Sequence, residues 1–136
     1  MEREIMRDVL FLARKSEEAT PADVELAKDL QDTLQAHSED CVGMAANMIG
    51  VRKRVIIFNY ALVPLVMFNP VVLSKKHPYE TEEGCLFLKG RRPTVRYEEI
   101  TVSYRDKDWR EKTITLTGFP AQICQHELDH LEGIII

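Results

Sequence analysis

Apolar residues recur at helical spacing between residues 20 and 37. They form one stripe, which consists of Val24, Ala27, Leu30 and Leu34. Thr20 is suited to cap a helix N-terminus, and proline, which follows it, is favoured in the first helical turn. The pattern therefore predicts a helix that begins at Thr20 and runs to about His37. A weaker helical pattern covers residues 1–15 through Ile5, Val9 and Leu12.

After residue 54 the helical spacing gives way to short runs of β-branched and aromatic residues, which are typical of strands. These runs cover residues 55–58, 65–68, 100–104 and 113–116. Asn69 and Pro70 punctuate the second run. The turn-like residues 106–108 separate the last two runs, and this spacing predicts an antiparallel hairpin.

A final helix is predicted to begin near Pro120 and to end at Gly133. One face of this helix is apolar and carries Ala121, Cys124, Leu128 and Leu131. His126 and His130 lie together on the opposite side. Because both faces have something to bury, we expect an α+β fold in which antiparallel sheets pack around a central, C-terminal helix.

The composition is typical of a globular protein. The 136 residues are 45% hydrophobic and 29% charged, so we expect a single domain that spans residues 1–136 and folds without crosslinks. The net charge of −4 and the absence of a basic stripe argue against nucleic-acid binding. An acidic start and the lack of a membrane-length apolar run predict a cytoplasmic protein without membrane contact. The three cysteines are an odd number and are too few for a disulfide framework.

The chemistry is concentrated in one short segment of the last helix, His126-Glu127-Leu128-Asp129-His130. This is an H-E-x-x-H motif, in which two imidazoles one turn apart can share a metal ion while the glutamate reaches a water beside it. The alternative is a solvated helix face that carries two histidines and no metal. A catalytic site of this type needs a third protein ligand. Among upstream residues the candidates are His37, Cys41, His77, Cys85 and the acidic residues, whereas Cys124 points to the opposite face.

Three segments together resemble the signature motifs of the peptide deformylases: residues 43–50, residues 83–86 and residues 125–130. The resemblance implies one divalent metal ion held by Cys85, His126 and His130, with Glu127 as base and acid. It further implies that the Leu86 N–H stabilises the oxyanion, and that the substrate lies along Gly43, Cys85 and Leu86. Iron(II) is the usual metal of that family in the cell, with zinc or nickel as substitutes.

The implied activity is removal of the formyl group from the N-terminal formyl-methionine of nascent proteins, by attack of a metal-activated hydroxide. N-formylated nascent peptides are then the partners, which is compatible with proximity to the ribosome. Two other functions stay open at this point. One is a weakened, deformylase-like metal-binding protein that binds N-terminal peptides, and the other is a small metallopeptidase.

The sequence departs from the family pattern at several positions around the expected site. Met48 stands where the first motif has a glutamine that donates a hydrogen bond to the oxyanion, and methionine has no donor. Cys41 and Phe87 replace a glycine and a serine. Gln122, one turn before His126, faces either solvent at the helix edge or the pocket for the first substrate side chain, where it would be unusually polar.

Overall fold

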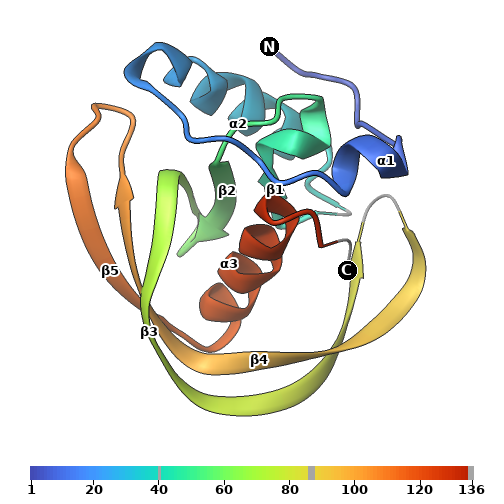
Figure 1. Cartoon of the computed structure of the whole chain (residues 1–136), viewed down its shortest axis with the longest axis vertical. Helices are drawn as coiled ribbons and strands as arrows, with labels where there is room; N and C mark the ends of the chain where they lie inside the picture. The colour runs from blue at the N-terminus through green and yellow to red at the C-terminus, as the bar shows by residue number, and fades with distance from the viewer. Residues whose placement is uncertain (40, 86–87, 135–136) are drawn as a thin grey trace.

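The computed structural model describes residues 1–39, 41–85 and 88–134, with the side chains of residues 85 and 88–90 outside that description (Figure 1). The helices are α1 (Val9–Leu12), α2 (Leu26–Ala36) and α3 (Gly118–Leu131), with 3-10 helices η1 (Pro21–Asp23) and η2 (Ala46–Ile49). The strands are β1 (Gly43–Ala45), β2 (Val55–Tyr60), β3 (Val63–Cys85), β4 (Leu88–Arg105) and β5 (Glu111–Thr117).

The strands form one antiparallel sheet in the order β1-β2-β3-β4-β5, so each strand pairs with its neighbours in sequence. All four predicted strand runs lie inside β2, β3, β4 and β5, and the predicted hairpin at residues 106–108 joins β4 to β5. Figure 1 shows α3 in the middle of the molecule with the sheet curved around it. The expected α+β class with a central C-terminal helix is therefore confirmed.

Strands β3 and β4 continue far beyond the runs that predicted them and form a long two-stranded ribbon. Asn69 and Pro70 do not end β3, but mark a register shift between Phe68 and Val71. Asn69 adopts a positive φ of 51°, and its side-chain amide makes two hydrogen bonds with the backbone of Ala19. The apparent stop signal is thus a bulge, and bulges bend a strand and increase its twist. The ribbon passes beneath α3 in Figure 1.

The core lies between α3, the sheet and α2. Residues 55–58 of β2 are all fully buried, so both faces of this strand are covered. Contacts with α2 and α3 account for this double burial. On α3, Ala121, Cys124 and Leu131 are fully buried, as the apolar face of the predicted helix requires, whereas Leu128 is only partly buried.

The N-terminal third shows one confirmed helix and one wrong expectation. Thr20 precedes η1, and α2 follows and ends with His37 as its C-cap, close to the predicted boundaries. The weak helical pattern over residues 1–15 gives only the single turn α1. Backbone N–H groups of Arg3 and Met6 donate instead to Thr33 Oγ1 and Met48 O, so this segment lies across other elements rather than coiling. None of the helices in the described ranges is long and apolar enough to cross a membrane.

Candidate metal centre

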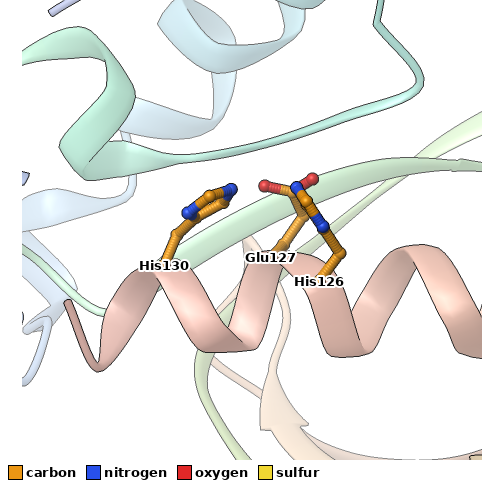
Figure 2. A group of neighbouring side chains, drawn as sticks. All are labelled: His126, Glu127 and His130. Carbon is orange, nitrogen blue, oxygen red and sulfur yellow. The ribbon is translucent and has the colours of Figure 1, made fainter. Parts of the chain in front are cut away.

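His126, Glu127 and His130 project from one side of α3 and form the only group of potential metal-binding side chains found among the residues that the structure describes (Figure 2). One ligand atom from each lies within 4.8 Å of the others. The two imidazole rings meet edge to face with centroids 4.6 Å apart, and the Glu127 carboxylate lies between them in Figure 2. The predicted motif therefore converges on one point.

His130 is held as a neutral imidazole. Burial, with a further contribution from His126, lowers its pKa to about 3. Its Nδ1 lies 3.1 Å from the carbonyl oxygen of Ile134, which can only accept a hydrogen bond. Nδ1 therefore carries the proton and the lone pair is on Nε2, as a metal ligand requires.

His126 is oriented by Glu83. Its Nδ1 lies 2.8 Å from Glu83 Oε1, so the carboxylate accepts the Nδ1 proton and the other ring nitrogen faces Glu127 and His130. Burial alone would raise the pKa of Glu83. Hydrogen bonds from His126, Arg96 and Gln122 outweigh that effect and lower the pKa to about 2. Glu83 is therefore a stable anion beside the first histidine.

Arg96 of β4 connects Glu83 to the helix motif. Its Nη2 lies 2.7 Å from Glu83 Oε1, and its Nη1 lies 2.7 Å from Asp129 Oδ2. Arg96 and Glu83 are each less than a tenth exposed. The sequence reasoning missed this network, because the ribbon brings together residues that are distant along the chain. The only sequence signal for this network was the presence of Glu83 inside the second motif.

Glu127 is the residue of the site whose burial is least compensated by hydrogen bonds. It is nearly fully buried, and its Oε1 has no hydrogen-bond partner among the described residues. Burial raises the pKa of its carboxyl to about 7. A buried acceptor is costly unless something satisfies it, and a cation or a water held between the two imidazoles would do so. The side chains present thus fit a divalent metal.

A cavity of about 680 Å³ opens beside these residues. Gly43 lies on its wall, where a Cβ atom would come within 2.9 Å of Ile123 Cγ2 and 3.1 Å of Glu127 Oε2. The absence of a side chain thus lets the β1 backbone approach the carboxylate closely. Cys41 and Met48 also line the cavity, and Met48 Sδ accepts the Ala45 N–H at 3.4 Å.

The third ligand stays a prediction. Cys85 is the last residue of β3 and is paired with Leu88, but its side chain lies outside the described atoms. Leu86 and Phe87 also lie outside the described residues. The preceding Gly84 lines the cavity, so the end of β3 reaches the site. Of the other upstream candidates, His37 and Cys41 line the cavity and His77 does not.

Two imidazoles on an H-E-x-x-H helix, a buried carboxylate beside them and an adjoining cavity define a metal-dependent hydrolase. The comparison with protein families makes this assignment specific. The model described as polypeptide deformylase matches residues 5–136, and the chain belongs to that family.

Individual relatives agree with the family assignment. The chain is 54% identical to the peptide deformylase of Clostridium beijerinckii over 136 residues, the full length of both proteins. Its fold is similar to a peptide deformylase from Legionella pneumophila, with a TM-score of 0.89 and 30% identity over 99% of this chain and 83% of that one. A Met-Ala-Ser bound crystal structure of the Acinetobacter baumannii enzyme gives a TM-score of 0.87 at 28% identity, over 99% and 97% of the two chains.

The chain is accordingly a hydrolase of the peptide deformylase type with one catalytic metal. These findings support the deformylase interpretation, and they do not support the metallopeptidase or the binding protein without turnover.

Replacing Glu83 tests whether it orients His126. Glu83→Gln keeps the shape but removes the anion, and outer partners of metal ligands are typically worth about 10- to 100-fold in metal affinity. We expect a loss of that size, measured by competition with a chromogenic chelator for Zn²⁺. The exposed Glu80→Gln on the same strand is the control. Unchanged affinity in a variant with a native circular dichroism spectrum would contradict the orienting role.

Proposed function

We propose that this chain removes the formyl group from N-terminal formyl-methionine, using a divalent metal held by Cys85, His126 and His130. The observation that carries the proposal is the buried Glu127 oxygen beside two imidazoles, which has no hydrogen-bond partner among the described residues. Two imidazoles and one thiolate form a three-ligand set that leaves a position open for water. Iron(II) is the proposed metal in the cell, with zinc or nickel as substitutes.

When bound, the metal supplies Lewis acidity that lowers the pKa of a water beside it and polarises the formyl carbonyl. Glu127 acts on that water. Its carboxylate can accept a proton from that water and release it again. Glu127 accepts a proton as the water attacks the formyl carbon, and then donates it to the departing amine. The products are formate and a peptide with a free N-terminus.

The substrate backbone is proposed to lie along β1. This strand is the first in the sheet order, so β2 pairs with one of its edges and no described strand pairs with the other. Gly43 keeps that edge close to Glu127 because it has no side chain. The Leu86 N–H is proposed to hold the developing oxyanion, and the substrate is proposed to pass along Cys85 beside it. The Met-Ala-Ser peptide bound by the Acinetobacter enzyme supports a peptide that begins with methionine.

The proposal extends to the cellular setting. N-formylated nascent peptides are the proposed partners, in the cytoplasm and near the ribosome that produces them. The net charge of −4 supports a protein that binds no nucleic acid of its own.

Glu127→Gln tests the proposed function directly. The amide keeps the shape and cannot accept the proton, so hydrolysis of formyl-Met-Ala should fall by about a hundredfold or more while metal content is kept. Formate release from the anaerobically purified, metal-loaded protein measures turnover, and elemental analysis measures the metal. Glu132→Gln, an exposed change at the end of the same helix, is the control. Equal turnover in parent and Glu127→Gln would refute the role of Glu127.

Cys85→Ser tests the proposed third ligand. A serine hydroxyl is not ionised at neutral pH, so the variant should bind zinc much more weakly than the parent. Chelator competition measures the affinity, and Cys41→Ser, a change on the same cavity, should leave it within about threefold. Retention of full zinc affinity by Cys85→Ser would exclude the thiolate as a ligand.

Met48→Gln tests the departure from the family motif. The Met48 sulfur now accepts the Ala45 N–H, and a glutamine of similar length could accept it through Oε1 and direct its amide protons into the cavity. A restored oxyanion donor is worth up to about a hundredfold, chiefly in kcat. We therefore expect faster hydrolysis of formyl-Met-Ala in steady-state assays. Normal metal content without any gain in kcat would show that Met48 does not limit the reaction.

A further inference from the structure

The N-terminal segment forms a second hollow beside the metal cavity. This second hollow measures about 580 Å³, and its lining consists of Glu2, Arg3, Glu4, Ile5, Arg7 and His37. Arg7 and His37 also line the metal cavity, so the two hollows adjoin at these two residues. The reaction proposed for the metal site makes no use of the second hollow.

Contacts with α2 and η2 hold the N-terminal segment in place. The guanidinium of Arg3 lies 2.8 Å from Asp29 Oδ2, and the backbone N–H of Arg3 donates to Thr33 Oγ1. The Met6 N–H donates to the carbonyl of Met48 at 2.7 Å, and Met48 lines the metal cavity. The wall of the second hollow is therefore tied to the wall of the metal cavity.

A substrate that lies along β1 has one open way out along that strand. The formyl group has to lie beside Glu127, and Gly43 is the residue of β1 that approaches this carboxylate. Residues 44–48, which follow Gly43, are almost completely buried. Before Gly43, Val42 is 43% exposed and Cys41 is half-buried, and both line the cavity. Because a nascent chain must continue into solvent, it leaves past Val42 and Cys41.

Cys41 connects this way out to the second hollow. Its Sγ lies 2.7 Å from the Gly43 carbonyl oxygen, and its N–H donates to the His37 carbonyl at 2.9 Å. A strand-like peptide advances about 3.3 Å per residue and pairs residue for residue with its neighbour. The first two substrate residues therefore cover Gly43 and Val42. The third and later residues then reach His37, which lines both hollows.

The second hollow offers both kinds of hydrogen-bonding group. The guanidinium of Arg7 carries donors, the carboxylates of Glu2 and Glu4 carry acceptors, and all three residues are exposed. Each residue of a peptide backbone other than proline has one donor and one acceptor. Such a lining can bond the backbone of an extended peptide whatever side chains it carries, which suits substrates that differ in sequence after the first residue.

We propose that the second hollow is a binding site for the third and following residues of the N-formyl substrate. The ligand class is an N-formyl peptide or protein N-terminus of at least four residues, recognised through its backbone. This inference rests on the proposed deformylase function, and it adds a preference for long substrates to that function.

The test compares formyl-Met-Ala with formyl-Met-Ala-Ser-Thr-Ser in the metal-loaded parent and in Arg7→Ala. Contacts that are equal in the ground state and the transition state act on KM rather than on kcat. In the parent we expect a KM about 3- to 10-fold lower for the longer peptide, the scale of one hydrogen bond. Arg7→Ala should remove most of this advantage. Arg14→Ala, which replaces an exposed arginine that lines neither hollow, should keep it.

Equal KM values for the two peptides in the parent would overturn the inference and leave the deformylase function standing. An advantage of the longer peptide that Arg7→Ala leaves intact would overturn it as well. Failure of the parent to hydrolyse either peptide would count against the deformylase function instead.

Binding followed by NMR decides the inference independently of turnover. With zinc-loaded Glu127→Gln, the longer peptide should shift the backbone amide signals of residues 2–5, which line the second hollow and not the metal cavity. Formyl-Met-Ala should leave those signals in place. Shifts confined to the metal cavity with both peptides, or no binding at all, would refute a substrate site in the second hollow.

Discussion

The buried carboxylate of Glu83 holds the histidine-bearing face of α3 to the long ribbon. It lies near the end of β3 and accepts hydrogen bonds from Arg96 on β4 and from His126 and Gln122 on α3. Burying two opposite charges costs several kcal/mol per ion and is repaid only by close geometry and further hydrogen bonds. Glu83 meets both conditions. The aim of the first imidazole depends on this carboxylate, and the Arg96–Asp129 ion pair adds a second link between the ribbon and the helix.

The residues of the metal site tolerate substitution less than some other residues that line the cavity. Glu83, His126, Glu127 and His130 are constrained by one another, because each change would leave a buried charge or acceptor unsatisfied. Met48 also lines the cavity, but the hydrogen bond of its sulfur is with the Ala45 N–H and not with any of these charged groups. A residue such as Met48 can therefore depart from the family pattern without disturbing the metal ligands. Chemistry and selectivity are thus encoded at separate positions of one small cavity.

The sequence predicted the helix and strands whose patterns are local, and missed what depends on distant pairing. The H-E-x-x-H segment and the apolar run at residues 55–58 each indicated their structure unaided. Residues 71–99 gave no strand signal, because a two-stranded ribbon with much polar surface needs no apolar run. Arg96 could not be foreseen, since only the β3–β4 register brings it to Glu83. The N-terminal segment failed because its backbone donors find partners on α2 and η2.

The side chain of Gln125 on α3 makes the backbone hydrogen bonds that a further strand would make at one edge of the sheet. Its amide oxygen accepts the Tyr97 N–H and its amide nitrogen donates to the Tyr97 carbonyl, both at 2.8 Å. Strand β5 pairs with β4 only from Glu99 onward, so the edge of β4 at Tyr97 lies beyond the reach of that neighbour. An uncovered strand edge is a template on which a second chain can add. By imitating one peptide unit of a further strand, Gln125 blocks that addition where the ribbon bends over the helix, and so guards the protein against edge-to-edge aggregation.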